Sequence, residues 1–148
     1  MDTVVIRPLT ETDVDSVYQL GIREPAFSFD QSTIGFWSKE QLTAWFSSEK
    51  DVCLGAFSET GTKLIGFAMV AVHPPTKKAI WENLWVISEA RGLGIGELLT
   101  RKLQRKLKQN GISHACFLVN HDNPQALHHF RQAHFPECGV FSWFSLQC

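Results

Sequence analysis

Three glycines stand within five residues in segment 91–96, between an apolar run and a basic, helix-like stretch. Glycine has no Cβ, so the backbone there can approach a ligand closely. The helix that we expect from about Glu97 begins with amide groups that lack partners inside the helix, and its dipole places partial positive charge at that end. This combination is typical of a site for a phosphate or a pyrophosphate.

Two well-known glycine loops do not fit this segment. A dinucleotide fold places G-x-G-x-x-G after its first strand, whereas Gly92, Gly94 and Gly96 have a different spacing and follow three or more predicted strands. A triphosphate-binding loop ends in Gly-Lys followed by Ser or Thr, and that sequence is missing here. The glycine cluster considered alone is also compatible with a tight turn that binds no ligand.

The residues on either side of the loop narrow the choice of ligand. Segment 81–99 resembles the acetyl-CoA-binding motif of the GNAT N-acetyltransferase superfamily, in which a strand ending in L-x-V is followed by a short turn and by [RQ]-x-x-G-x-[GA]. A second stretch fits the family pattern N-x-x-A-x-x-x-[YF]-x-x-x-G-F. The residues that match the two patterns are Arg91, Gly94, Gly96, Asn123, Ala126 and Phe135. Within the superfamily, the order of elements looks closest to the branch that acetylates protein N-termini, including ribosomal-protein alanine acetyltransferases.

The strands and helices that carry these motifs can be predicted from hydrophobic periodicity, helix caps and turn residues. We expect strands at 4–7, 52–57, 64–72, 79–87, 115–119 and 139–146, and helices after the caps at 10–13, 38–41 and 123–124 and over about 97–109. This order predicts an α+β (mixed α/β) fold with helices on both faces of a mixed sheet, in one domain over residues 1–148. The resemblance implies a GNAT-like acyl-CoA N-acyltransferase fold, whose mostly antiparallel twisted sheet contains a splayed parallel pair.

Composition excludes several classes of function. The chain has 148 residues and a net charge of −1, which argues against a general nucleic-acid binder. No apolar run approaches the roughly 20 residues that span a bilayer, and no signal peptide is visible. Four widely spaced cysteines and no Cys-x-x-Cys indicate reduced thiols in a cytoplasmic protein without a metal site. We expect a monomer or a homodimer that binds neither nucleic acid nor membrane.

The resemblance implies acetyl-CoA as the co-substrate, with its pyrophosphate on the loop amides and its pantetheine arm paired with the strand at 84–86 like an added strand. Arg91 or Lys102 would help to hold the 3′-phosphate, and Asn123 would contact the arm. The residues that we assign to the cofactor on this basis are Leu84, Trp85, Val86, Arg91, Gly92, Leu93, Gly94, Ile95, Gly96, Glu97, Asn123, His129 and Phe130.

Acyl transfer to an amine requires a neutral amine, yet a lysine-type ammonium has a pKa of about 10.4 and an α-amine one of about 8. Glu82 is the candidate for general base, because it is the only acid on the strand that leads into the motif. Alternation along that strand predicts that Glu82, Leu84 and Val86 share one face, so that burial would raise the pKa of Glu82. A surface glutamate without a catalytic role is the other reading.

The chain departs from the family pattern at Phe130, where a tyrosine often protonates the departing sulfur. Phenylalanine has no proton to give, although a thiol with a pKa near 8.5 can leave as thiolate. His134 lies four residues further on, would share the helix face of Phe130, and is our candidate for a catalytic acid, with His129 as a second. The departure also leaves room for an acyl-CoA-binding regulatory or sensor module without turnover.

The resemblance implies that the acceptor is a primary amine, on a peptide or a small molecule, and places it against loops 23–37 and 136–142. An apolar wall would be formed by Phe27, Phe29, Phe36 and Trp37. Asp30 or Glu24 would bind the ammonium. Core packing is the alternative for these aromatic residues. A structural subunit of a larger complex is a third reading, supported by the candidate surface tryptophans Trp81, Trp85 and Trp143.

Overall fold

The chain is described by a computed structural model over residues 4–27, 35–140 and 142, which fall into two units divided between Leu118 and Val119. Each unit is described by itself, and the single domain over 1–148 stays a prediction. The strands are β1 (Val5–Pro8), β2 (Val52–Phe57), β3 (Leu64–His73), β4 (Lys78–Val86) and β5 (His114–Phe117), and the α-helices are α1 (Val14–Gly21), α2 (Lys39–Phe46), α3 (Ile95–Gln109) and α4 (Pro124–Gln132).

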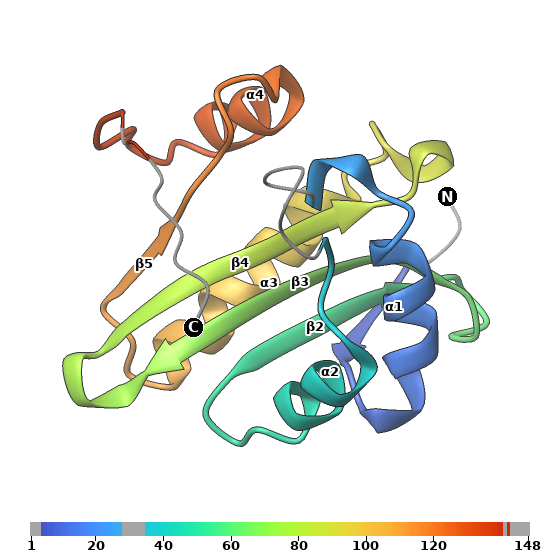
Figure 1. The fold of residues 1–148 in the computed structure, drawn as a ribbon. Coiled ribbons are helices and arrows are strands. Elements are labelled where there is room, and N and C mark those ends of the chain that lie inside the picture. The colour runs from blue at the N-terminus through green and yellow to red at the C-terminus, as the bar shows by residue number, and fades with distance from the viewer. Residues whose placement is uncertain (1–3, 28–34, 141, 143–148) are drawn as a thin grey trace. The chain divides into compact units, whose positions relative to one another are not determined.

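The first unit is built on a five-stranded sheet in the order β1-β2-β3-β4-β5 (Figure 1). The first four strands pair antiparallel with their neighbours, whereas β4 and β5 run parallel. A parallel pair needs a crossover connection, which α3 supplies. The predicted mixed α/β class, with a mostly antiparallel sheet and one parallel pair, is confirmed.

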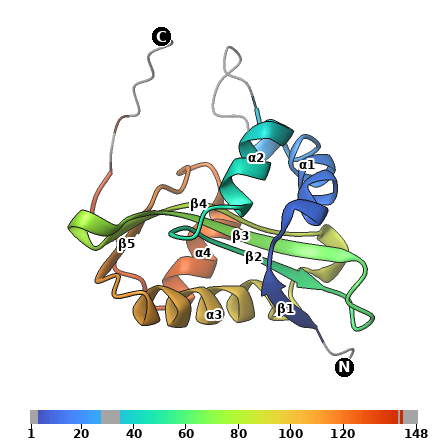
Figure 2. The same cartoon turned by 90° about the horizontal axis from the view of Figure 1, so that it is seen from below.

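Helices cover the central strands from both sides, with α1 and α2 on one face of the sheet and α3 on the other (Figure 2). Every residue of β2 is buried, as are most residues of β3, because both faces of these strands are covered. Phe67 and Met69 of β3 pack with Val17 of α1 and Leu42 of α2, and all four side chains are fully buried. The opposite face receives the apolar side of α3, made by Ile95, Leu99, Leu103 and Leu107.

Caps fix where the helices begin. Ser38 accepts a hydrogen bond from the Gln41 amide at 3.2 Å, and the Gln41 side chain returns one from the Ser38 amide at 2.8 Å, which is the predicted capping box. Before α1, the buried Asp13 carboxylate receives two bonds of 2.8 Å from the Arg7 guanidinium. Burial acts to raise the pKa of Asp13, but the bonds from Arg7 and Thr10 outweigh it and lower that pKa.

The second unit contains α4, whose first turn holds Pro124 as predicted. The Asn123 side chain caps this helix by accepting a hydrogen bond from the Ala126 amide at 3.0 Å. The strand predicted at 139–146 is wrong for Gly139, Val140 and Ser142, which adopt no regular structure, and the rest of that range lies outside the described residues.

Candidate functional site

A β-bulge interrupts β4 at Glu82. Met69 of β3 pairs with Asn83, yet the next residue, Val70, pairs with Trp81, so that Glu82 is the extra residue on the β4 side. A bulge leaves a residue outside the ladder and redirects the side chains around it. The bulge interrupts the regular period of two along β4 at this residue, and the predicted common face of Glu82 with Leu84 and Val86 stays a prediction.

The same position marks the end of the pairing between β4 and β5. The register runs from Lys78 opposite His114 to Trp81 opposite Phe117, and the ring of Phe117 packs edge-on against Trp81 at 5.7 Å. Within the described part of the first unit, β4 beyond Trp81 pairs with β3 alone. An open edge of strand backbone therefore starts beside Glu82, as expected for a splayed parallel pair.

The Glu82 side chain is exposed, whereas Trp81 and Asn83 on either side are buried. Surrounding atoms nevertheless remove enough water from the carboxylate to raise the pKa of Glu82, and desolvation alone accounts for the rise. The predicted direction of this pKa shift is confirmed. A raised pKa suits a general base, because such a carboxylate holds an abstracted proton more readily.

Two indole N–H groups bind Asn83. The Trp37 Nε1 donates to its side-chain Oδ1 at 2.9 Å, and the Trp81 Nε1 donates to its backbone oxygen, also at 2.9 Å. Trp81 is only 4% exposed, so the prediction of a surface tryptophan at this position is wrong. Both indoles hold the residue directly after Glu82.

The glycine loop runs from a short 3-10 turn at Ser88–Ala90 into α3. Gly92 and Gly94 have φ angles of 77° and 79°, in the left-handed region that glycine adopts at little cost. A Cβ built on either would meet no atom within 4 Å, so the space above both is open. The loop thus combines a backbone that favours glycine with room for a ligand.

Helix α3 begins at Ile95, two residues before the predicted start, with Gly94 at its N-cap and no side-chain cap. Its first helical hydrogen bond runs from the Leu98 amide to the Gly94 carbonyl at 3.0 Å. The amides of Ile95, Gly96 and Glu97 precede that bond and form the end at which a helix binds anions. Leu93, which is 70% exposed, directs its side chain away from any core.

Arg91 links the loop to the end of β4. Its Nε donates to the Val86 carbonyl at 2.9 Å, and its terminal nitrogen donates to the Glu24 carboxylate at 3.3 Å. The same oxygen of Glu24 accepts a bond of 2.6 Å from the Trp85 indole. Glu24 therefore ties the segment after α1 both to β4 and to the start of the loop.

On the predicted acceptor side, Phe27 packs against Phe36 at 5.1 Å and against Phe67 at 6.1 Å, and Phe36 is buried. These contacts favour the core reading for Phe27 and Phe36. Phe29 and Asp30, which we predicted to line the acceptor site, lie outside the described residues.

In the second unit, α4 ends at Gln132, so His134 does not share a helix face with Phe130 as predicted. His134 has a φ angle of 59° and occupies the position where the family pattern has glycine. Its backbone is therefore left-handed, as is common just after a helix. The Phe130 ring packs edge-on against Phe135 at 5.8 Å and against His129 at 5.1 Å.

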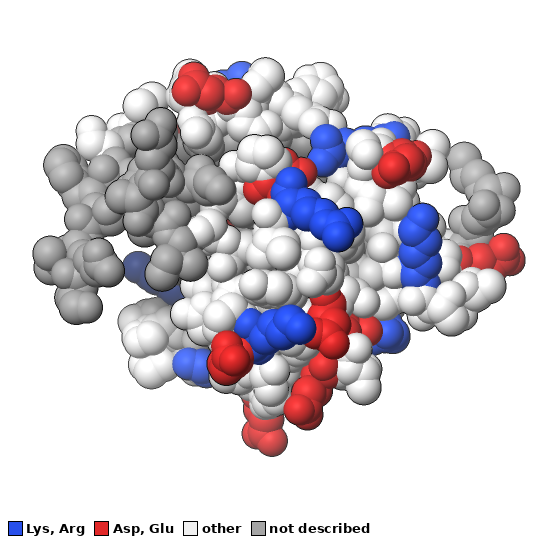
Figure 3. Space-filling view, turned by 45° about the vertical axis from the view of Figure 1, so that its right-hand side comes forward, with Lys and Arg blue, Asp and Glu red and all other residues white. Residues whose placement is uncertain are grey.

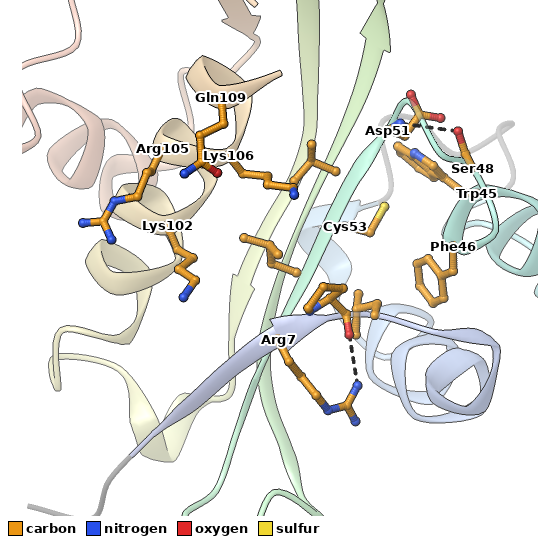
Figure 4. Close-up of a pocket in the computed structure, with 14 residues that line it drawn as sticks. Arg7, Trp45, Phe46, Ser48, Asp51, Cys53, Lys102, Arg105, Lys106 and Gln109 are labelled. Carbon is orange, nitrogen blue, oxygen red and sulfur yellow. Dashed lines mark hydrogen bonds between the residues drawn. The ribbon is translucent and has the colours of Figure 1, made fainter. Parts of the chain in front are cut away.

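A cavity of about 440 Å³ lies elsewhere in the first unit, between residues of β1, β2, the end of α2 and the later turns of α3 (Figure 4). Lys102, one candidate for the 3′-phosphate, lines this cavity, and Arg105 is directed away from the β2 residues. Burial raises the pKa of the Cys53 thiol in its wall to about 12. Neither the bulge nor the glycine loop contributes to it.

Charges of both signs are interspersed over the face drawn in Figure 3, with no continuous field of one sign among the described residues shown there. No helix in the described parts of the chain combines the length and apolar character needed to cross a bilayer. Within the same parts, His, Cys, Asp and Glu side chains form no group of three that could hold a metal ion.

The model of the acetyltransferase (GNAT) family matches residues 17–135, which include β4, the glycine loop and α4. The chain belongs to the GNAT acetyltransferase family. The predicted family and fold are confirmed, and the predicted enzyme class agrees with them.

Among curated proteins, the chain is similar to the streptothricin acetyltransferase of Streptomyces lavendulae, with 32% identity over 79 residues. The match covers 53% of this chain and spans only 42% of that GNAT relative's length.

Two solved GNAT structures show the same fold at low identity. One is the PaiA N-acetyltransferase of Thermoplasma acidophilum in complex with coenzyme A, with a TM-score of 0.71, 21% identity and 88% coverage of each chain. The other is the ribosomal-protein-S18-alanine N-acetyltransferase of Escherichia coli, with a TM-score of 0.74 and 21% identity over 93% of this chain and 80% of that one.

Sequence reasoning about this GNAT chain missed Asn83. It assigned other places to the two indoles that bind this residue, Trp37 to the acceptor wall and Trp81 to the surface. A signal was present, because Glu82 and Asn83 are consecutive polar residues inside an otherwise apolar strand. Alternation places one of two such neighbours on the buried side, so the pair indicates a buried polar residue that needs hydrogen-bond partners. The contact of Trp37 with Asn83 spans 46 residues and carries no local signal.

Proposed function

We propose that this GNAT protein transfers an acetyl group from acetyl-CoA directly to a primary amine. The observation that carries the proposal is the open edge of β4, which begins beside Glu82 and ends at the glycine loop. A donor lying along this edge would have its anionic end at the helix terminus and its acyl end near the carboxylate.

The loop fits a pyrophosphate. Amides at the start of α3 would donate to its oxygens, and the open space above Gly92 and Gly94 would allow the close approach. The arm of the donor would pair with the free edge of β4. Because Arg91 occupies the Val86 carbonyl, we expect this pairing to use the Leu84 carbonyl and the Val86 amide.

Glu82 would accept the proton of the acceptor ammonium, directly or through one water. The neutral nitrogen then attacks the thioester carbonyl carbon, and the carbon–sulfur bond breaks so that coenzyme A leaves as the thiolate. The nitrogen, which carries a positive charge after the attack, loses its second proton to solvent. A β4 backbone amide would stabilise the developing oxyanion. Since Phe130 cannot donate a proton, the thiolate would take one from solvent.

The acceptor class stays open between the amines that GNAT relatives acetylate, a small molecule such as streptothricin or the N-terminal alanine of a protein. A donor-binding module without turnover is the second candidate, and Phe130 at the family's tyrosine position favours it.

The test is to incubate the protein with acetyl-CoA and a panel of amines, and to follow free thiol. The panel contains peptides with N-terminal alanine, lysine peptides, polyamines and streptothricin, with a reaction lacking acceptor as the background. We expect thiol release above background with at least one acceptor. Tight acetyl-CoA binding by calorimetry without thiol release from any of them would favour the binding module instead.

A further inference from the structure

We propose that Trp37 and Trp81 are positioning residues, whose indole N–H groups clamp Asn83 and thereby hold the bulge that presents Glu82 at the open edge of β4. This inference rests on the proposed function, because the bulge matters for catalysis only if Glu82 is the general base. The clamp itself can be tested without turnover.

The clamp satisfies a residue that the bulge disturbs. Asn83 is a buried polar residue, 8% exposed, in a strand where ladder pairing shifts by one position. A buried polar group without a hydrogen bond is costly, so the bulge needs hydrogen bonds from side chains in addition to those between strand backbones. Trp81 supplies one donor to the Asn83 backbone and Trp37 supplies another to its side chain.

Each indole is itself fixed by packing. The Trp81 ring meets Phe117 edge-on at the last pair of the β4–β5 ladder, and the Trp37 ring meets Trp45 edge-on at 5.2 Å. The first contact places a clamp at the point where the two strands separate. The second anchors the bulge to α2, far along the chain.

The geometry makes Glu82 dependent on its neighbours. The side chain of Glu82 is exposed, and desolvation by the surrounding atoms is what raises its pKa. Its environment is therefore set by the backbone path through the bulge. If the clamp is released, the strand can relax toward regular pairing and the carboxylate gains water.

The chain offers a matched control. The Trp45 Nε1 is buried and has no hydrogen-bond partner among the residues that the structure describes. Trp45→Phe therefore removes an indole N–H from the same aromatic cluster without breaking a bond seen there. By contrast, Trp37→Phe and Trp81→Phe each delete one bond to Asn83 while keeping an aromatic ring in place.

The first experiment titrates the Glu82 carboxyl by carbon-13 NMR in the wild type and the three variants. We expect its pKa to fall toward the ordinary glutamate value in Trp37→Phe and Trp81→Phe, and to stay unchanged in Trp45→Phe. Equal pKa values in all four proteins would overturn the clamp, whatever the outcome for acetyl transfer.

The second experiment measures kcat, KM and coenzyme A affinity with an acceptor found in the amine panel. Each clamp variant should lose about tenfold in kcat, with the coenzyme A affinity within twofold of wild type, and Trp45→Phe should match wild type in both. In a Glu82→Gln background the clamp substitutions should cause no further loss of kcat. A loss of the same size in that background would mean that the indoles only support the fold, and the proposal would fail.

The two experiments separate the possible failures. If the wild type acetylates no amine, the proposed function fails, while the NMR titration still decides the clamp. If the wild type turns over and the clamp variants behave like Trp45→Phe, only the clamp fails. Thermal unfolding of each variant, followed by circular dichroism, identifies any protein that has lost its fold.

Discussion

The glycine loop and the β4 bulge lie within one stretch of chain and are held in different ways. In the loop, Gly92 and Gly94 adopt φ angles of 77° and 79° with nothing packed above them, so the residue type itself permits the backbone shape. In the bulge, Glu82 and Asn83 have no special residue type, and the indole side chains of Trp37 and Trp81 bind the side chain and the backbone of Asn83. The loop shape is encoded locally, whereas the bulge depends on packing.

This difference predicts how the two regions respond to substitution. At the loop, an added side chain should act directly on the ligand that occupies the open space. At the bulge, the reacting group and the groups that position it are separate, so their effects should be coupled.

Replacing the candidate base tests the bulge. We expect Glu82→Gln to lower kcat by roughly 10²–10⁴-fold, the range typical of general acid–base catalysis, with little change in coenzyme A affinity. The rate of wild type should fall as the pH drops through the raised pKa of Glu82, beginning at a higher pH than an ordinary glutamate would give, and this limb should vanish in the variant. Steady-state pH profiles measure both effects, with Glu59→Gln at the exposed β2–β3 turn as the control.

The same substitution should slightly stabilise the fold. A carboxyl group with a raised folded-state pKa contributes stability below its unfolded pKa and loses that contribution as the pH rises through the folded value. At neutral pH, Glu82→Gln should therefore raise the free energy of unfolding, by less than about 1 kcal/mol because solvent screens an exposed carboxylate. A clear loss of stability in urea titrations would contradict the desolvation reading.

Blocking the loop tests the other region. We expect Gly94→Glu to weaken coenzyme A binding at least about 100-fold, because the side chain fills the open space and its charge repels a phosphate. Gly111→Glu is a matched control, since Gly111 follows the other end of α3, has a φ angle of 74° and also has open space above it. Calorimetry that finds equal losses in both variants would show that backbone strain, and not the ligand, is responsible.

The two regions also differ in what the sequence reveals. The capping box at Ser38, the strand at 52–57 and the glycine loop were predictable, because each rests on neighbouring residues. The bulge in β4 was not predicted, since a register shift depends on the partner strand and on Trp37, 46 residues from Asn83. His134 was misplaced for a related reason, as α4 stops two residues earlier. Contacts that are distant in sequence leave no periodic signal.

Arg91 connects the loop to β4, so a substitution of Arg91 tests whether the two regions act as one site. If Arg91 orders the loop through the Val86 carbonyl and Glu24, Arg91→Met should weaken coenzyme A and dephospho-coenzyme A equally, by about tenfold, as expected when hydrogen bonds from a charged group are lost. If it binds the 3′-phosphate, as the resemblance implied, only coenzyme A should be weakened, because dephospho-coenzyme A lacks that group. Calorimetry with the two ligands distinguishes these roles.

His134, a left-handed residue outside both regions, tests the role of glycine through a small change in stability. His134 has a φ angle of 59° although it is not glycine, so the chain tolerates a side chain in this conformation where no ligand has been proposed to rest on the backbone. A left-handed backbone costs a residue with a Cβ roughly 1–2 kcal/mol, part of which the greater freedom of glycine in the unfolded chain offsets. His134→Gly should therefore stabilise the protein by about 0.5–1 kcal/mol in chemical denaturation and leave coenzyme A affinity unchanged. A marked loss of kcat with unchanged stability would instead give His134 the acid role that its sequence position suggested, and would show that its imidazole matters more than its backbone.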